Sequence, residues 1–276
     1  MTFELCPRTL LPGADHQQEG NGLRIQGSVA LVTGANRGLG RHFVDGLIAF
    51  GAEKIYACAR DPESLAPLEA AHGGRIAPLR LDVTEPAAVA AAVERAADLT
   101  LLVNNAGVLE GRGLMEAGSV APLEREMAVN VFGLARMCLA FAPVLRRNGG
   151  AIVNMLSVAG MMNFPPFGSY GASKAAAMSL TQCLRYELKD RGVEVFGVYA
   201  GFIDTAVIDY VKADKSAPEG VVRAALDGIE GGIADIDADP RSQEVRAALR
   251  DDPSALEAAM WERAKGFRVD HPVGED

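Results

Sequence analysis

The stretch that decides the fold runs from Val29 to Gly40 and has the sequence VALVTGANRGLG. Its first five residues, Val29–Thr33, are apolar and β-branched or aliphatic, which is typical of a buried strand. Glycines follow at positions 34, 38 and 40, beside a helical pattern over 39–50. A backbone without side chains there can approach a pyrophosphate, whose charge the amides at a helix start receive. Alone, this unit does not distinguish a nucleotide site from an ordinary turn, since its order matches neither G-x-G-x-x-G nor a Walker loop.

The same alternation of strand and helix extends outward from this stretch over residues 28–205. Further buried strands are predicted at 54–59, 76–81, 99–103, 151–156 and 193–199. Helical patterns lie between them, at 86–97, 120–147 and 168–191. Such alternation indicates βαβ units on a parallel sheet. We expect a single α/β domain with a doubly wound, Rossmann-like sheet, because an eight-unit barrel would need more chain.

The two ends of the chain lack this alternation. Residues 1–27 combine prolines and glycines with polar residues, and we expect an arm outside the core. Residues 206–276 are expected to form a variable region that covers the substrate, with helices at 207–212, 219–230 and 241–250. Its acidic run, 235–239, is expected to be a solvated loop. A cation site is the alternative for this run, although it lacks the glycine and distal glutamate of an EF-hand.

Composition and charge exclude several classes of function. The chain has 27 basic and 36 acidic residues, a net charge of −9, and so no field that would attract nucleic acid. Hydrophobic residues make up 49%, yet the apolar runs are interrupted well before the ~20 residues of a membrane span. The four cysteines have no CxxC spacing, and the N-terminus has an acid where a signal peptide needs positive charge. We therefore expect reduced thiols and a cytoplasmic protein.

Polar residues that can carry chemistry follow the fourth and fifth predicted strands. The turn 104–107, Asn-Asn-Ala-Gly, lies at the edge where open α/β sheets bind ligands, although an ordinary polar turn explains it equally well. Ser157 ends the fifth strand, and Tyr170 and Lys174 follow in a helical pattern. Positions i and i+4 share a helix face, so the Lys174 ammonium can stand beside the Tyr170 phenol and lower its pKa. Such a phenol can exchange a proton with an alcohol or carbonyl oxygen.

Together these features resemble the short-chain dehydrogenase/reductase family over residues 28–205. The glycine loop, the 104–107 turn, Asn130 within Val-Asn-Val-Phe-Gly, Ser157 and the Tyr170/Lys174 pair occur in the family's order. The resemblance implies that Tyr170 is the general acid/base and that Ser157 hydrogen-bonds the reacting oxygen. It also implies that Lys174 holds the nicotinamide ribose and lowers the Tyr170 pKa, while Asn130 supports a proton-relaying water chain. The family's hydride transfer needs no metal, and the histidines at 16, 42, 72 and 271 show no ligand spacing.

The resemblance implies a nicotinamide cofactor, and three residues favour NADP(H) over NAD(H). Ala59 stands where NAD-binding relatives have an acid, while Arg37 and Arg60 can pair with a 2′-phosphate. Asp61 would support NAD(H) if the second strand ended one residue later. The cofactor-binding residues that the resemblance implies are Thr33, Gly34, Asn36, Arg37, Gly38, Leu39, Gly40, Arg60, Asp82, Val83, Asn105, Ala106, Gly107, Tyr170, Lys174, Gly201, Ile203 and Thr205.

Two positions depart from the family's pattern. Ala200 replaces the usual proline after the sixth strand, which leaves the loop for the nicotinamide amide without a φ lock. Leu156 replaces a small serine before Ser157. Neither change removes a proton-transfer group, so both concern rate and substrate fit more than the class of reaction.

The substrate and partners are less closely specified. Met161, Phe164, Phe202 and Tyr210 predict an apolar pocket that suits a hydrophobic ketone, aldehyde or alcohol, although such residues also fill cores. The implied activity is carbonyl reduction with NADP(H), or the reverse. The alternatives are a non-catalytic NADP-binding sensor or scaffold, and dehydratase or epimerase chemistry on the same fold. The helices 120–147 and 168–191 fit the family's homodimer or homotetramer contacts.

Overall fold

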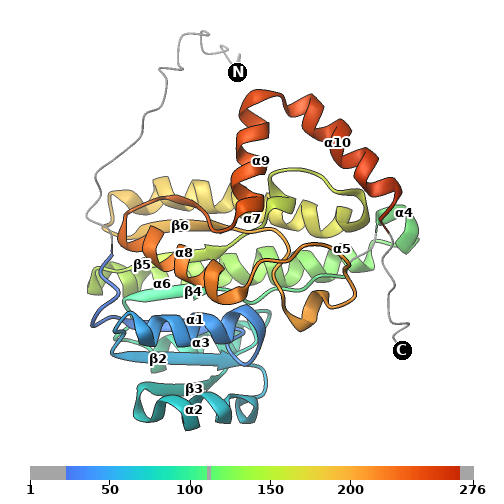
Figure 1. The fold of residues 1–276 in the computed structure, drawn as a ribbon. Helices are drawn as coiled ribbons and strands as arrows, with labels where there is room; N and C mark the ends of the chain where they lie inside the picture. The colour runs from blue at the N-terminus through green and yellow to red at the C-terminus, as the bar shows by residue number, and fades with distance from the viewer. Residues whose placement is uncertain (1–22, 111–112, 268–276) are drawn as a thin grey trace, which may run out of the picture.

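The computed structural model describes residues 23–110 and 113–267, and its centre is a seven-stranded parallel sheet (Figure 1). The strand order β3-β2-β1-β4-β5-β6-β7 confirms the predicted doubly wound, Rossmann-like fold. The order reverses at β1, so the carboxyl ends of β1 and β4 open the crevice where such sheets bind ligands. The strands are β1 Val29–Thr33, β2 Lys54–Ala59, β3 Ile76–Arg80, β4 Leu101–Asn104, β5 Ala151–Met155, β6 Glu194–Tyr199 and β7 Asp235–Asp237.

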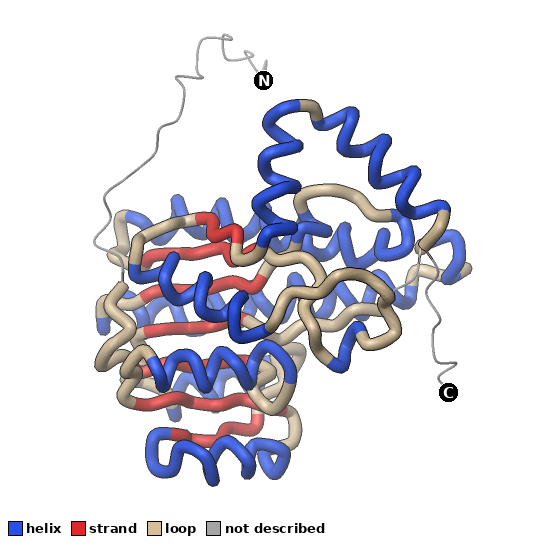
Figure 2. The backbone as a smooth tube through the Cα atoms, in the orientation of Figure 1, coloured by secondary structure: helices blue, strands red, loops and turns tan. Residues whose placement is uncertain are grey.

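Helices cover both faces of the sheet, which Figure 2 shows as a layer of strands between helices. Ala30 and Val32 of β1 pack into the core on one face, and Leu31 packs into the core on the other. All three side chains are fully buried, as expected for a parallel sheet with two covered faces. The first face is covered by α1 Gly38–Ala49 and α8 Pro218–Glu230, and the second by α3 Pro86–Arg95, α6 Leu134–Asn148 and α7 Gly168–Lys189.

Proline marks the start of several helices. α3, α8, α9 (Pro240–Asp251) and α10 (Pro253–Lys265) each begin with a proline, whose missing N–H would have no helical partner at that position. The other helices are α2 Ala66–His72, α4 Leu114–Ala117 and α5 Ala121–Glu126. Short 3₁₀ turns lie at Pro62–Leu65, Gly73–Arg75, Val158–Gly160, Pro165–Phe167 and Ala206–Ile208.

The helix predicted over 120–147 contains a π-helical insert. α5 leads into a π-helix at Met127–Gly133, which leads into α6. The insert carries Asn130, whose side chain is buried, and π-helical turns of this kind often accompany functional sites. By length and composition Ala121–Asn148 could cross a membrane, since its most apolar 18 residues have a mean hydropathy of 1.7, but half of that window is buried within the protein. Met137 and Phe141 pack against the sheet, as in a core helix.

The region after residue 205 differs from the prediction. The prediction of a solvated loop at 235–239 is wrong, because Asp235–Asp237 forms β7 and pairs with β6. Arg185 and Arg246 form ion pairs with Asp235 and Asp237, so the carboxylates are matched by side chains of the protein itself. In the described part of the chain, no three His, Cys, Asp or Glu side chains are grouped to hold a metal ion. The helix predicted at 207–212 is only the short 3₁₀ turn, and α10 was not predicted.

The expected N-terminal arm begins outside the described residues, which start at Leu23. Ile25, within the range expected to be an arm, is fully buried and belongs to the core beside β1. Its backbone N–H donates to the Glu230 carboxylate at the end of α8, at 3.2 Å. Residues 23–27, the described end of this segment, are therefore packed on the domain, and the sequence did not indicate this because an isolated apolar residue gives no periodic signal.

Candidate active site

The glycine loop between β1 and α1 forms one wall of a cavity of about 1330 Å³ at the carboxyl ends of the strands. Gly38 has a φ of +51°, in the left-handed region that favours glycine. A Cβ atom on Gly40 would lie 2.1 Å from the carbonyl oxygen of Gly34, so no side chain fits there. α1 begins at Gly38, and its first residues line the cavity. Unpaired amides at a helix start are a phosphate-binding arrangement.

Thr33 and Asn105 tie the ends of β1 and β4 together. The Thr33 hydroxyl accepts hydrogen bonds from the backbone N–H groups of Asn105 and Ala106, each at 2.9 Å. In return, the Asn105 side-chain amide donates to the carbonyl oxygen of Thr33 at 2.9 Å. The 104–107 turn is therefore a brace that fixes two walls of the cavity relative to each other.

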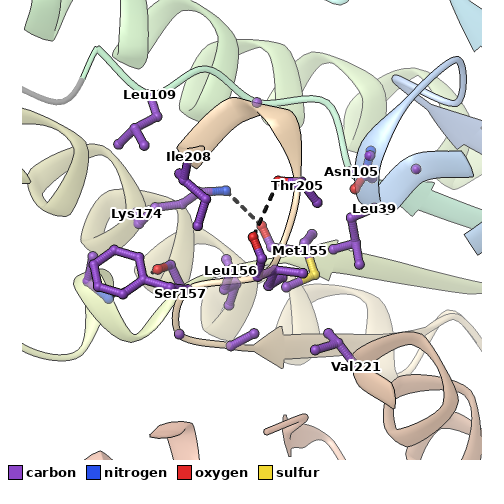
Figure 3. Close-up of a pocket in the computed structure, with 18 of the residues that line it drawn as sticks. Leu39, Asn105, Leu109, Met155, Leu156, Ser157, Lys174, Thr205, Ile208 and Val221 are labelled. Atoms are coloured by element: carbon purple, nitrogen blue, oxygen red, sulfur yellow. Dashed lines mark hydrogen bonds between the residues drawn. The ribbon is translucent and has the colours of Figure 1, made fainter. Parts of the chain in front are cut away.

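Ser157, Tyr170 and Lys174 meet on the other side of the same cavity. Ser157 follows β5, and Tyr170 and Lys174 lie one turn apart on α7. The Tyr170 phenol is hydrogen-bonded to Ser157. The Lys174 amine lies 5.8 Å from the centre of the Tyr170 ring. It donates to the carbonyl oxygen of Met155 at 2.8 Å (Figure 3). The structure thus brings Ser157, from the end of a strand, together with the two residues that the sequence placed on one helix.

Burial dominates the electrostatics of Tyr170 and Lys174. It raises the pKa of Tyr170 to about 12, although the hydrogen bond with Ser157 acts in the opposite direction. Burial also lowers the pKa of Lys174 to about 8. The net pKa of Tyr170 is therefore raised, because burial penalises the phenolate more than the hydrogen bond with Ser157 favours it. The lowering effect expected of Lys174, whose amine is held by the Met155 carbonyl oxygen, stays a prediction. Tyr170 is a neutral phenol at neutral pH, with a proton to donate.

Asn130 joins the loop after β4 to α7 through side-chain hydrogen bonds. Its Oδ1 atom accepts from the Val108 N–H, and its Nδ2 atom donates to the Val108 carbonyl oxygen and to the Ser173 hydroxyl, each at 2.9 Å. A Cβ atom built on Gly107 would lie 3.2 Å from Asn130 Oδ1 and 3.8 Å from Lys174 Nζ. Asn130 therefore lies near Lys174, and its hydrogen bonds fix the segment that passes both.

Glu126 is a buried acid near the site that the sequence did not reveal. Its side chain on α5 is fully buried, and its Oε1 atom accepts from the Glu110 N–H at 2.9 Å. It also shares a hydrogen bond with Ser169, the residue before Tyr170. Burial raises the pKa of Glu126, and the negative charge of Glu126 contributes to the raised pKa values of Tyr170 and Tyr210. The sequence carries no signal that separates Glu126 from its charged neighbours Glu124 and Arg125 on the same helix.

The far end of the cavity lies beyond β2 and β3. β2 ends at Ala59, as predicted, so the condition under which Asp61 would reach the ribose is not met. Asp61 accepts the backbone N–H of Glu63 at 3.1 Å and caps the following 3₁₀ turn, and it lines the cavity beside Arg60. The predicted cofactor residues that line this end are Arg37, Arg60, Asp82 and Val83.

The loop after β6 joins the two ends of the cavity. Gly201, Ile203 and Thr205 all line it, as the family's pattern implied. A Cβ atom on Gly38 would lie 3.6 Å from the Thr205 methyl group, so this loop touches the glycine loop. Of the remaining predicted cofactor residues, Gly34, Asn36, Leu39, Gly40, Asn105, Ala106 and Gly107 also line the cavity.

An apolar wall lies beside Tyr170. The ring centres of Phe164 and Phe167 are 6.0 Å apart, and those of Phe167 and Phe202 are 5.8 Å apart. Of the four residues predicted to contact substrate, Phe164 and Phe202 line the cavity, whereas Met161 and Tyr210 pack in the neighbouring apolar clusters. The apolar lining residues that the sequence did not indicate include Leu109 and Met260.

Comparison with known proteins assigns the family. The family model described as short chain dehydrogenase matches residues 28–216. The chain belongs to the short-chain dehydrogenase family. The 3-alpha-(or 20-beta)-hydroxysteroid dehydrogenase of Mycobacterium tuberculosis is 33% identical over 209 residues, covering 74% of this chain and 77% of that protein. The trans-4-hydroxycyclohexanecarboxylate dehydrogenase of Sinomonas cyclohexanicum is 34% identical over 194 residues, covering 66% and 74%.

Solved structures of short-chain dehydrogenases share the same fold. A short chain dehydrogenase from Burkholderia cenocepacia J2315, solved in complex with NADP, has a TM-score of 0.82 and 40% identity, covering 86% of this chain and 99% of that chain. A short chain dehydrogenase/reductase from Burkholderia phymatum, solved in complex with NAD, has a TM-score of 0.75 and 26% identity, covering 92% and 100%. Similar folds therefore bind either dinucleotide.

Both departures of this short-chain dehydrogenase from its family's pattern are accommodated by packing. Leu156 is buried, and its Cδ1 atom lies 3.0 Å from where a Cβ atom on Gly197 would stand, so the glycine in β6 makes room for it. Ala200 is also buried, and its carbonyl oxygen accepts from the Val158 N–H at 3.1 Å. The start of the loop after β6 is thus held by a backbone hydrogen bond rather than by a proline ring.

Proposed function

We propose that this oxidoreductase reduces a ketone or aldehyde to an alcohol with NADP(H), and catalyses the reverse reaction, with Tyr170 as general acid/base. The observation that carries the proposal is the meeting of Tyr170, Ser157 and Lys174 in the cavity that the glycine loop also lines. One end of this cavity offers proton chemistry, and the other offers a backbone that a phosphate can approach.

The residues present fit a nicotinamide dinucleotide. A Cβ atom at Gly40 would collide with the loop backbone, and this lack of side chains leaves the start of α1 open to a pyrophosphate. Arg37 and Arg60 would hold the adenosine end, and Lys174 and the loop 201–205 would hold the nicotinamide end. When bound, the cofactor supplies or accepts a hydride at nicotinamide C4.

The chain's own residues manage the proton. In the reducing direction Tyr170 donates its phenolic proton to the carbonyl oxygen as the carbonyl carbon gains the hydride. The Ser157 hydroxyl donates a hydrogen bond to the same oxygen and stabilises its developing negative charge. An ammonium has three donors, and the Met155 carbonyl uses one from Lys174, which leaves two for the ribose hydroxyls. Asn130, near Lys174, is placed to support a water chain that replaces the proton.

The preference for NADP(H) rests on the end of β2. Ala59 is buried where an acid would grip the ribose, and the guanidinium groups of Arg37 and Arg60 are available to a 2′-phosphate. The Burkholderia cenocepacia structure with NADP supports the proposal, whereas the Burkholderia phymatum structure contains NAD. We expect kcat/KM with NADPH to exceed that with NADH by tenfold or more. Equal use of both cofactors would contradict the preference.

The proposed substrate is an apolar carbonyl compound or alcohol. Phe164, Phe167 and Phe202 supply aromatic faces close to Tyr170, with Leu109 and Ile208 completing an apolar lining. Such a lining favours hydrophobic ketones and aldehydes over sugars. Two relatives carry names for a hydroxysteroid and a hydroxycyclohexanecarboxylate, both with alicyclic rings.

The experiment is a panel of ketones, aldehydes and quinones scored by the loss of NADPH absorbance, with wild type and Tyr170→Phe compared on every active compound. The variant should lose turnover and still bind NADPH, measured by cofactor fluorescence, because it lacks only the proton donor. Unchanged turnover would remove Tyr170 from the mechanism. If wild type binds NADPH but consumes no compound, the alternative of a non-catalytic sensor gains support.

We also propose that residues 206–276 cover the substrate through only part of their length. α8 and β7 complete the layers of the domain around the sheet, whereas α9 and α10 stand at its upper end in Figure 1. Arg241 of α9 and Met260 of α10 line the cavity. We assign the cover to 206–217, α9 and α10.

A homodimer or homotetramer is proposed from the exposed apolar side chains of the π-helix, α6 and α7. Phe132, Leu139 and Tyr186 are 58%, 73% and 80% exposed, which is unusual for large apolar residues on adjacent helices. Light scattering should give a multiple of the chain mass, and Leu139→Glu should reduce it; a monomeric wild type would contradict the proposal. We further propose a cytoplasmic location, with which the free thiols Cys58 and Cys138 are consistent. The proposed partner is a small molecule, and we propose no nucleic-acid or membrane partner.

A further inference from the structure

Asp239 is a buried carboxylate at the join between β7 and α9, only 4% exposed. Its Oδ1 atom accepts the Ser242 N–H at 2.8 Å and caps α9. Its Oδ2 atom accepts the Gly201 N–H at 2.8 Å and the Ser216 hydroxyl at 3.0 Å. One side chain therefore connects the start of α9 with two segments that line the cavity.

The contact with Gly201 continues the edge of the sheet through a side chain. Along this edge, the Gly197 N–H donates to the Ala234 carbonyl oxygen and the Ala238 N–H donates to the Tyr199 carbonyl oxygen, both between backbones. At Gly201 the backbone leaves the sheet, and the Asp239 carboxylate takes its N–H instead. A charged acceptor makes a stronger hydrogen bond than a carbonyl, so the loop is held firmly where the strand ends.

Ser216 extends this hold along the rest of the loop. Its backbone N–H donates to the Phe202 carbonyl oxygen at 2.8 Å, and its carbonyl oxygen accepts from the Asp204 N–H at 3.0 Å. Thr205, one residue further, contacts the glycine loop at Gly38. Residues 201–205 thus span the cavity from the phosphate-binding end to Tyr170, where the nicotinamide must lie for hydride transfer.

We infer that Asp239 is a positioning residue that fixes the nicotinamide end of the cofactor through the 201–205 loop. The inference rests on the proposed function, since it concerns how that cofactor is held. It accounts for how the loop is fixed although Ala200 stands at its start in place of a proline. The effect of Asp239 should be confined to the nicotinamide half of the cofactor. The adenosine end is lined by residues after β2 and β3, which Asp239 does not touch.

The geometry requires a carboxylate at position 239 rather than any polar side chain. All three partners of its oxygens, Gly201, Ser216 and Ser242, donate hydrogens to it. An asparagine offers one acceptor oxygen and one NH₂ group, which would face either the Ser242 N–H or the donors of the loop. Asp239→Asn therefore loses either the cap or the clamp while nearly preserving size.

The test compares Asp239→Asn with Ser242→Ala, a matched change at the same helix start. The Ser242 hydroxyl accepts from the Asp239 N–H and donates to the Asp239 carbonyl oxygen, so its loss weakens the start of α9 without removing an acceptor from the loop. For each protein we would measure Kd for NADPH and for 2′-phospho-ADP-ribose, which shares the adenosine and pyrophosphate but lacks nicotinamide.

We expect Asp239→Asn to weaken NADPH binding by about tenfold relative to the fragment, the scale of one hydrogen bond to a charged group. Ser242→Ala should lower the Tm and leave the ratio of the two Kd values as in wild type. If Asp239→Asn does not fold, Ser216→Ala removes one clamp bond and should shift the ratio in the same direction by a smaller factor.

Two outcomes overturn the inference. The first is a ratio of the two Kd values that stays as in wild type in both Asp239→Asn and Ser216→Ala. The second is a change in this ratio that is equal in Asp239→Asn and Ser242→Ala. Either would make Asp239 only a helix cap. If wild type binds neither NADPH nor the fragment, the proposed function fails first and the inference with it. The fragment measurement therefore separates failure of the positioning role from failure of the cofactor assignment.

Discussion

Replacing Lys174 by methionine should stabilise the fold while it abolishes turnover. The Lys174 side chain is 6% exposed, and burial lowers its pKa from 10.5 to about 8. At neutral pH the folded protein therefore holds a buried ammonium that the unfolded chain exposes to water. Methionine has a similar length and no charge, so the replacement removes this penalty without opening a large cavity.

The size of the effect follows from the pKa difference. A change from 10.5 to about 8 corresponds to about 3 kcal/mol of free energy of unfolding at pH 7. The variant also leaves the Met155 carbonyl oxygen without its partner at 2.8 Å, a loss of about 1 kcal/mol. The net gain is about 2 kcal/mol, or a rise in Tm of about 4 to 8 °C for a domain of this size.

The sign of the pH dependence is fixed by the depressed pKa. Between about pH 8 and 10.5 the unfolded Lys174 binds more protons than the folded one, so wild-type stability rises with pH across this window. That stability is lost as the pH falls through the folded pKa. The advantage of Lys174→Met should therefore shrink toward zero by pH 10.

Thermal unfolding at pH 7 and pH 10, without added cofactor, measures both effects. Lys265→Met is the control, because Lys265 is exposed and its partners, Glu262 and the Trp261 ring, also lie on the surface. Its Tm should follow that of wild type at both values. A lower Tm for Lys174→Met than for wild type at pH 7 would refute the reasoning. So would a Tm difference between the two proteins that is the same at pH 7 and pH 10.

Three further predictions follow from the site. Gly40→Ala places a Cβ atom 2.1 Å from backbone and should weaken NADPH binding at least tenfold, whereas Gly74→Ala, with nothing within 4 Å, should not; equal Kd values would contradict the close-approach argument. Burial raises the pKa of Glu126, so the folded protein pays a growing cost for its ionisation as the pH rises above 4.5. The Tm of Glu126→Gln should therefore rise relative to the wild-type Tm over this range, and a Tm difference that falls with pH would contradict the prediction. Arg60→Ala should lower kcat/KM for NADPH about tenfold and leave that for NADH unchanged; a parallel fall in both would assign Arg60 to the fold.

The sequence was most informative where burial is complete. β1 and β2 match their predicted ranges, because buried parallel strands are continuous apolar runs with a clear end. Ser157, Tyr170 and Lys174 were found through spacing and family resemblance, and the structure shows what spacing alone does not: that the end of β5 meets α7 at one cavity.

The parts that were missed have weak local signals. β7 is three residues long and buries only Ile236, so its alternation is too short to separate it from an acidic loop. The pKa of Tyr170 could not be predicted from the i, i+4 relation to Lys174, because burial depends on the rest of the fold. Glu126 was overlooked for the same reason, since its side chain is buried only by contacts from other elements.

The two outermost strands of the sheet bear on the protein's resistance to aggregation. A strand at the margin of a sheet presents unpaired backbone groups to which another chain's strand can add. β3 contains Pro78, which has no N–H to offer such a strand. β7 has only three residues, and Asp237 on it is paired with Arg246. One imino acid and one very short acidic strand thus limit edge-to-edge polymerisation, so that self-association is left to the helical surfaces.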